Sequence, residues 1–311
     1  MPQTKRFAFR RILRMRRVVA TVVCVSAFCV QVIPHTAVAF QAAPSQANAN
    51  PKPEVKLTPA QLLVVQAREQ IKNSQWDLAL ETSDKALALE PTNAGAFVAR
   101  GMALNGKIDY DAAIAEFDKT TAQGGRDPLL LVHRADAYAH RSVALYQKGQ
   151  YLDAINSAYF ALLEKNDHHE AHHFRAVAYI ARSQFDKAIN STNRAIGAKA
   201  DYAEAYSTRG VAYAGKGNDK QALADQDKAL ELQSDLAIAL QRRGSLHAKK
   251  GDLVKAIQDL DQAVKVAPQS PDALCDRAFI YGIGRDLTKA AADIEAALKL
   301  DPSFPKAKFQ K

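Results

Sequence analysis

Residues 169–173, His-Glu-Ala-His-His, have the spacing of a zinc-binding helix. Residues four apart share one face of a helix, so His169 and His173 could reach one metal ion while Glu170 moved a proton. A zinc site needs a third ligand, and Glu204 is the carboxylate within reach. Two interpretations stay open: a metal site, structural or hydrolytic, or the polar first turn of an ordinary helix. We expect the ordinary helix, and no bound metal.

No other catalytic motif is present in the sequence. It contains no nucleophile elbow, no glycine-rich phosphate loop and no paired cysteines at metal-binding spacing. The motifs therefore predict a protein that is not an enzyme and that needs no cofactor.

Residues 1–39 have the three parts of an export signal. Seven basic residues begin the segment, residues 18–33 are nearly all apolar, and Ala37-Val38-Ala39 offers small residues for cleavage before Phe40. We expect an exported chain, periplasmic or secreted from a bacterium, without stable membrane insertion. An uncleaved anchor is the alternative, although a spanning helix needs about 20 apolar residues. Arg10-Arg11 leaves open a twin-arginine signal in place of the general one.

This segment accounts for most of the net charge. The chain has 42 basic and 33 acidic residues, for a net charge of +9. Residues 1–39 hold 7 of the basic residues and no acidic ones, which leaves 35 against 33, or +2. Because the basic and acidic residues outside residues 1–39 are nearly equal in number and form no run of Lys or Arg, the charge pattern gives no sign of a nucleic-acid partner. Only Cys275 lies outside the export segment, so stability must come from packing.

Residues 40–59, rich in Ala, Pro, Gln and Asn, predict a flexible linker. The chain then repeats itself with a period of 34 residues. One position of each later repeat is always small: Ala154, Ala188, Ala222, Ala256 and Ala290. Upstream of it stands a series that we call the ladder arginines: Arg100, Arg175, Arg209, Arg243 and Arg277.

Two amphipathic helices are predicted in each repeat, because apolar residues recur three and four apart in two segments. Between the segments stand glycine and a capping residue, as in Gly251-Asp252 and in residues 216–219. The small residues mark places where two helix backbones approach closely. One helix pair cannot bury its apolar face alone, so each repeat depends on its neighbours.

With these features the sequence resembles the tetratricopeptide repeat family. Its Trp slot is filled here by Leu63, Phe97, Tyr206, Leu240 and Leu274, with His172 in the fourth repeat. The ladder arginines replace the family's Leu, as in many bacterial members. The resemblance implies an all-α, right-handed superhelical solenoid of about seven helix-turn-helix repeats. Their expected bounds are 60–93, 94–127, 128–168, 169–202, 203–236, 237–270 and 271–303, followed by a short tail, 304–311.

The third repeat is longer than the others. The step from Ala113 to Ala154 is 41, seven more than the period, and seven residues are close to two helical turns. We therefore expect one long helix over residues 128–147, capped by Asp127, whose end projects beyond its neighbours. Its apolar first turn, residues 129–132, either covers the second repeat or forms a docking spot.

The ladder arginines predict ion pairs within repeats. An acid follows sixteen residues after four of them: Glu116, Asp225, Asp259 and Asp293. In the third repeat both Arg134 and Arg141 fit the ladder position. Arg141 and Arg175 have Ser157 and Ser191 at that offset. Either these two arginines are unpaired and open to a partner's carboxylate or phosphate, or a backbone carbonyl or an acid of the next repeat satisfies them.

The resemblance implies a binding scaffold rather than a reaction, with partner proteins held in the concave groove of the first helices. When the groove positions of the family are transferred to this sequence one by one, the predicted groove is lined by Val98, Met102, Val143, Tyr146, His173, Val177, Ile180, Val211, Gln241, Phe279 and Ile283. These residues are more apolar than charged, so we expect an apolar segment or an amphipathic helix as ligand. The rivals are a metal-binding protein or zinc-dependent hydrolase built on residues 169–173, and a homo-oligomer formed through an uncapped last repeat.

Overall fold

The computed structural model describes residues 56–305. The predicted export signal, most of the predicted linker and most of the predicted tail lie outside these residues. The described part contains fourteen α-helices and no strand. It forms two units, an N-terminal half up to Asn166 and a C-terminal half from Asp167. None of the described helices is both long and apolar enough to cross a membrane.

Helices follow one another in pairs along the chain. The N-terminal half contains α2 (Pro59–Lys72), α3 (Trp76–Leu89), α4 (Ala94–Gly106), α5 (Tyr110–Thr121), α6 (Pro128–Gln147) and α7 (Tyr151–Glu164). The C-terminal half contains α8 (His169–Ala181), α9 (Phe185–Ala198), α10 (Ala203–Gly215), α11 (Asp219–Leu232), α12 (Ala237–Lys249), α13 (Leu253–Val266), α14 (Pro271–Ile283) and α15 (Leu287–Leu300).

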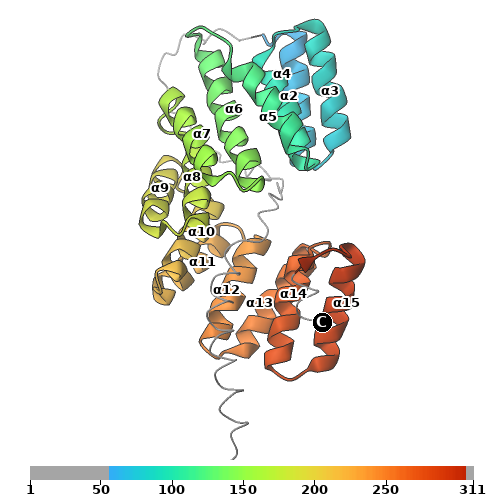
Figure 1. Cartoon of the computed structure of the whole chain (residues 1–311), viewed down its shortest axis with the longest axis vertical. Helices are drawn as coiled ribbons and strands as arrows, with labels where there is room; N and C mark the ends of the chain where they lie inside the picture. The colour runs from blue at the N-terminus through green and yellow to red at the C-terminus, as the bar shows by residue number, and fades with distance from the viewer. Residues whose placement is uncertain (1–55, 306–311) are drawn as a thin grey trace, which may run out of the picture. The chain divides into compact units, whose positions relative to one another are not determined.

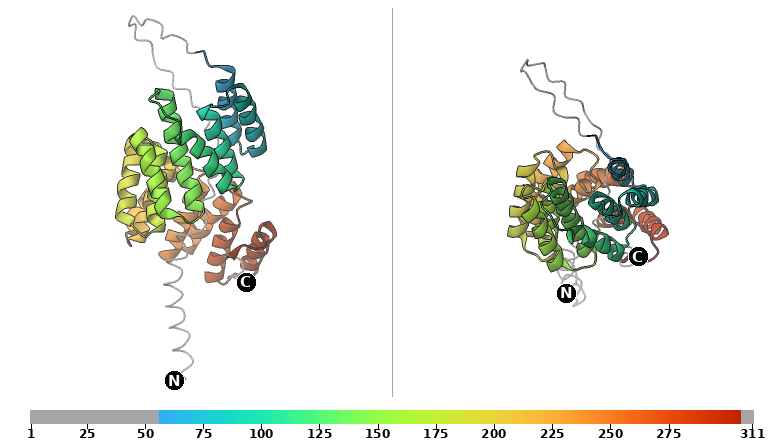
Figure 2. Two further views of the ribbon diagram at one scale, coloured as in Figure 1. Left: turned by 45° about the horizontal axis from the view of Figure 1, so that its top comes forward. Right: turned by 90° about the horizontal axis from the view of Figure 1, so that it is seen from above.

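Each pair forms an antiparallel hairpin that stacks on the next one within its half (Figures 1 and 2). The second helix of one pair contacts the first helix of the following pair, and first helices also contact each other. The prediction of an all-α fold built from repeated helix pairs is confirmed.

The turn inside each described hairpin has one conformation. The residue that follows the first helix's C-cap has a positive φ, between 56° and 87°, in every pair. These residues are Ser74, Ile108, Gly149, Ser183, Gly217, Gly251 and Arg285. The next residue begins the second helix as its N-cap, and Asp252 confirms the prediction of an acid in that role. After Gly217 the cap is Asn218 rather than the neighbouring Asp219.

The long helix of the third repeat is confirmed as α6, with Asp127 as its N-cap. The Asp127 side chain accepts hydrogen bonds from two backbone N–H groups at 3.0 Å each, which satisfies donors that a helix start leaves open. In the apolar first turn, Leu129 and Val132 are exposed, while Leu130 and Leu131 are half-buried.

Close helix contact inside the hairpins depends on the residue after each ladder arginine. A Cβ at Gly101 would lie 2.5 Å from the Phe117 ring, and one at Gly210 would lie 2.5 Å from Gln226 Nε2. Both large side chains stand sixteen residues after their glycine and are fully buried. Large residues on the second helix therefore require glycine on the first.

The final described hairpin is partly covered by residues that follow it. Phe304 packs against a cluster that includes Leu274, Cys275 and Ala297. The last repeat is thus not bare on that side, although residues 306–311 lie outside the described part.

Candidate interaction surface

The predicted groove residues of the N-terminal half differ in how far they are accessible. Val98 is fully buried and packs with Ala113, Phe117 and Ala137, so it belongs to the core between hairpins. Met102, Val143 and Tyr146 are half-buried. In this half, therefore, only the exposed parts of these three side chains are accessible to a ligand at the predicted positions.

An ion pair crosses the first helices of the same half. Arg68 on α2 donates to Asp136 on α6 at 2.7 Å. His133, also on α6, lies beside this pair against Gly95, and burial together with the Arg68 charge lowers its pKa. The side chains of the protein itself therefore connect the first and third repeats across the first-helix layer.

In the C-terminal half the predicted groove residues range from core to open surface. His173, Val177, Ile180 and Gln241 are buried. Ile180 packs in a cluster with Ala188 and Ala212, against which half-buried Val211 also packs. These side chains hold hairpins together and expose little area.

Phe279 and Ile283 on α14 are the open members of the predicted set. Their exposed fractions are 44% and 48%. They are four residues apart and so share one helix face. Between them Gly282 has no atom within 4 Å of the place where a Cβ would stand. The pair is an unobstructed apolar site on a first helix.

The residues 169–173 form the first turn of α8. His168 precedes them as N-cap, and its Nδ1 accepts a hydrogen bond from the Ala171 N–H at 3.2 Å. His172 is buried, in agreement with its place in the Trp slot. The motif begins an ordinary amphipathic helix.

Both ring nitrogens of His173 have protein partners. Nδ1 lies 2.9 Å from the Tyr202 hydroxyl, and Nε2 lies 2.9 Å from Thr208 Oγ1. Burial lowers the pKa of His173 to about 3, with a smaller contribution from the His169 charge. Burial also raises the pKa of Tyr202, helped by Glu170 and Glu204. The neutral ring thus links α8 to the beginning and the middle of α10.

The hydrogen bonds of His173 compete with the metal site considered for residues 169–173. Within residues 56–305, no group of three or more His, Cys, Asp or Glu side chains is arranged to hold a metal ion. His173 would have to leave two hydrogen bonds to reach an ion shared with His169. Glu204, the proposed third ligand, is half-buried in the first turn of α10.

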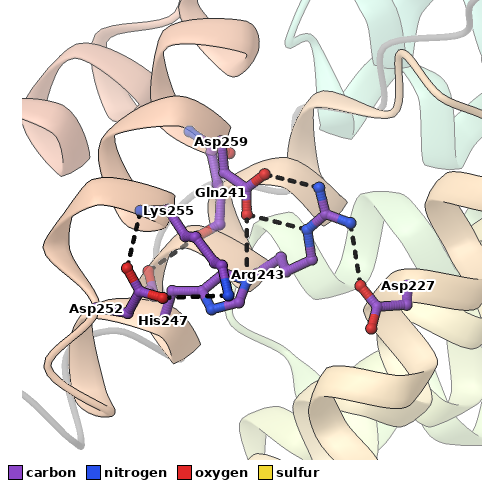
Figure 3. Close-up of polar contacts among 8 residues, drawn as sticks. Asp227, Gln241, Arg243, His247, Asp252, Lys255 and Asp259 are labelled. Atoms are coloured by element: carbon purple, nitrogen blue, oxygen red, sulfur yellow. Dashed lines mark hydrogen bonds and ion pairs between the residues drawn. The ribbon is translucent and has the colours of Figure 1, made fainter.

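The predicted arginine pairs are confirmed. Arg243 holds Asp259 with two hydrogen bonds, from Nε at 3.0 Å and from a terminal nitrogen at 2.7 Å (Figure 3). Its other terminal nitrogen donates to Asp227 of the preceding hairpin at 3.0 Å. The same pattern joins Arg277 to Asp293 and Asp261, and Arg209 to Asp225 and Asn193. Arg100 pairs with Asp84 at 3.0 Å and less closely with Glu116 at 3.6 Å.

Sequence reasoning missed the second partner of each arginine, which stands sixteen residues before it. This partner corrects the hypothesis that Arg141 is unpaired. Arg141 Nε donates to Asp118 at 2.7 Å. Asp118 precedes it by 23 residues, which is sixteen plus the seven inserted residues. Arg175, the other candidate, has a terminal nitrogen 3.4 Å from His172 Nδ1.

Comparisons with known proteins agree with this architecture. Tetratricopeptide repeat models match residues 64–128, 203–236 and 237–270. No curated protein sequence matches the chain.

Solved structures with the same fold share little sequence with this chain. A tetratricopeptide repeat protein from Parabacteroides merdae superposes with a TM-score of 0.60 at 15% identity, covering 81% of this chain and 96% of its own. The Cut9–Hcn1 assembly of the APC/C gives a TM-score of 0.65 at 14% identity, over 80% of this chain and 48% of that one. A thermophilic repeat protein from Thermus thermophilus gives 0.53 at 23% identity, over 57% and 96%. At such identities the likeness concerns the fold.

Proposed function

Because this chain belongs to the tetratricopeptide repeat family, whose members are protein–protein interaction scaffolds, we propose that it binds an apolar segment or amphipathic helix of a partner protein. The observation that carries the proposal is the exposed pair Phe279 and Ile283 beside Gly282. Two apolar residues four apart on a first helix fit the spacing by which a partner helix or extended segment places its anchors.

The surface that we assign to the partner is smaller than the predicted groove. It consists of the accessible members of that set, taken in each half by itself: Met102, Val143 and Tyr146 in the N-terminal half, and Val211, Phe279 and Ile283 in the C-terminal half. Each apolar side chain that a partner buries there contributes about 1.5 to 3 kcal/mol. The scaffold has no catalytic role in this proposal.

The proposed place of action is the cell envelope. This part of the proposal is supported by residues 1–39, whose basic start, apolar run and Ala37-Val38-Ala39 site have the pattern of a cleaved export signal. N-terminal sequencing of the protein recovered from the envelope fraction tests it. A mature chain that begins at Phe40 is expected, whereas an intact residue 1–39 segment in the membrane fraction would contradict cleavage.

The binding surface is tested with paired charge substitutions. A double variant, Phe279→Asp with Ile283→Asp, alters the proposed surface. A matched control, Val254→Asp with Leu287→Asp, places the same charges at second-helix residues that are even more exposed, at 69% and 71%. Proteins captured from envelope extract by each variant are compared with those captured by the unaltered chain.

We expect a partner that the control retains and the Phe279/Ile283 variant loses. Equal capture by both variants, with helix content unchanged, would refute this surface as the binding site. A Met102→Ala, Tyr146→Ala variant then shows whether the accessible residues of the N-terminal half take part.

A further inference from the structure

Two arginines, Arg141 and Arg175, lack the usual acid within their own hairpin, and Arg141 is the one that lines a pocket. Three ladder arginines use Nε and a terminal nitrogen to hold an aspartate sixteen residues later, as Arg243 holds Asp259. At Arg141 that position is Ser157, whose Oγ instead donates to the Tyr138 carbonyl at 2.9 Å. Ser157 is too short and already engaged, so it does not replace the carboxylate.

Arg141 consequently uses its guanidinium differently. Its Nε turns to Asp118 of the preceding hairpin. Within residues 56–305, neither terminal nitrogen of Arg141 has a hydrogen-bond partner, whereas Arg209, Arg243 and Arg277 engage both of theirs. The two terminal nitrogens form the planar fork that binds a carboxylate with two parallel hydrogen bonds.

This fork lines a surface pocket of about 480 Å³ between α5 and α7, over α6. The second helices bound it, so it is separate from the first-helix surface proposed above. Its lining includes Lys148, Asn156 and Ser157 beside Arg141, and Phe160 is one of its apolar residues. Phe160 is 46% exposed, which leaves its ring open to an apolar neighbour of the bound group.

Charge distinguishes this pocket from its counterpart in the C-terminal half. A pocket of about 410 Å³ lies between α11 and α13 around Arg243. Its lining has one cation, Arg243, against the three acids Asp227, Glu231 and Asp259. The lining at Arg141 has two cations and two acids, and both cations have an acidic partner: Lys148 pairs with Asp111, and Arg141 Nε pairs with Asp118, which lies outside the lining. The Arg243 pocket carries an excess of acids and both terminal nitrogens of Arg243 are occupied, whereas at Arg141 the acids are fewer and only Nε is occupied.

We infer that the Arg141 pocket binds a single carboxylate of a partner peptide, next to an apolar residue that packs on Phe160. The carboxylate binds the two terminal nitrogens and leaves Nε of Arg141 to Asp118. A phosphate dianion fits less well, because Asp111 and Asp153 also line the pocket and repel a second negative charge. The carboxylate belongs to a Glu or Asp side chain or to a peptide C-terminus.

The test uses the full chain and four sets of short peptides rich in Leu and Phe. The first set carries one central Glu and an amidated end, and the second carries Gln in its place. The third carries Gln with a free C-terminal carboxylate, and the fourth carries phosphoserine with an amidated end. Binding is measured by fluorescence anisotropy on labelled peptides for the unaltered chain and for three variants.

Ser157→Asp supplies the missing acid from within the hairpin and fills the fork. Arg141→Gln removes the fork at a partly exposed position, and it serves as the second variant if Ser157→Asp folds poorly. Ser191→Asp, the matched control, makes the same change at the same place in another repeat. Circular dichroism establishes that each variant keeps its helix content.

We expect the Glu set or the free-carboxylate set to bind about tenfold or more tighter than the amidated Gln set, since charge-assisted bidentate bonds are the strong ones. Which of the two sets binds identifies the source of the carboxylate. Ser157→Asp and Arg141→Gln should abolish the difference, and Ser191→Asp should keep it. Equal binding of the carboxylate and amidated Gln sets, no binding at all, or preference for phosphoserine would overturn the inference. Retained preference in Ser157→Asp would overturn it as well.

Discussion

One substitution, glycine to alanine, should have opposite effects at two helical positions of the C-terminal half. Gly197 lies inside α9, with no atom within 4 Å of a Cβ built on it. Gly210 lies inside α10, where the same Cβ would stand 2.5 Å from Gln226 Nε2 and 3.0 Å from the Ala222 carbonyl oxygen. Comparing the two variants therefore distinguishes the effect of helix propensity on stability from the effect of close packing.

The expected change in the free energy of unfolding follows from the surroundings of each glycine. Alanine is better than glycine in a helix interior by up to about 1 kcal/mol; at Gly197, one residue before the end of α9, about half of that gain is expected and no neighbouring atom opposes it. At Gly210 the new methyl displaces the buried Gln226 side chain, which exchanges hydrogen bonds of 2.8 and 2.9 Å with Ser207. Overpacking costs about 1–3 kcal/mol, and each lost hydrogen bond about 1 kcal/mol. The net effect of Gly210→Ala is a loss of about 2 kcal/mol.

Thermal unfolding followed by far-ultraviolet circular dichroism measures both effects. A change of 1 kcal/mol shifts Tm by about 2–4 °C in a chain of this size. Gly197→Ala should therefore raise Tm by about 1–2 °C, and Gly210→Ala should lower it by about 4–8 °C. A Gly210→Ala variant as stable as Gly197→Ala would refute the close approach of α10 and α11.

A double variant examines the cause more directly. The neighbouring repeat has Ala176 in the position of Gly210, and Thr192, sixteen residues later, in the position of Gln226. Combining Gly210→Ala with Gln226→Thr reproduces that pair. The double variant should be more stable than the sum of the two single effects by about 1 kcal/mol, because contacting residues are not additive. Strict additivity would mean that Gln226 is not the obstacle.

Three further predictions concern side chains in the turns, the ladder and the buried histidine. Ile108 has a φ of 67° and is 69% exposed, so Ile108→Gly should stabilise the N-terminal half by about 1 kcal/mol in urea unfolding, since a branched side chain is strained there. Asp259→Ala should cost about 2 kcal/mol in the same assay because the partly buried Arg243 loses a two-bond partner, whereas Asp227→Ala, at 56% side-chain exposure, should cost less than about 1 kcal/mol. The pKa of His173 is lowered to about 3, so the stability that its neutral ring provides is present above the unfolded pKa near 6.5 and falls as the pH drops from there toward 3. At pH 5 the unaltered chain should be about 2 kcal/mol less stable than at pH 7 on this account, and His173→Gln should flatten that dependence.

Each of these outcomes has a matched comparison. Gly251→Ala changes a glycine in the same turn position as Ile108 and should destabilise, so a gain there would contradict the strain argument. Equal losses for Asp259→Ala and Asp227→Ala would contradict the assigned roles of the two acids. An unchanged pH dependence in His173→Gln would show that other groups titrate in this range.

Much of the local structure follows from the sequence because it depends on neighbours along the chain. The 34-residue period predicts the helix pairs, and a repeated pattern of apolar residues requires repeated packing. The extent of α6 follows from Asp127, which caps a helix start, and from an insertion close to two turns, which keeps the same face buried. The ion pair of Arg243 with Asp259 follows from their fixed spacing within one hairpin.

Accessibility and partner choice were decided only by the tertiary structure. Val177 and Phe279 each stand two residues after a ladder arginine, yet Val177 is buried and Phe279 is 44% exposed, because the hairpins around each residue determine how much surface remains. Arg141 could not be assigned from spacing alone, since its Nε reaches Asp118 of another hairpin. The contacts of His173 with Tyr202 and Thr208 are likewise invisible in the motif at residues 169–173. The sequence by itself determined the repeated helical units, because their signals are local and periodic, whereas the exposed fraction of each side chain and the partner of Arg141 are decided by contacts between neighbouring hairpins.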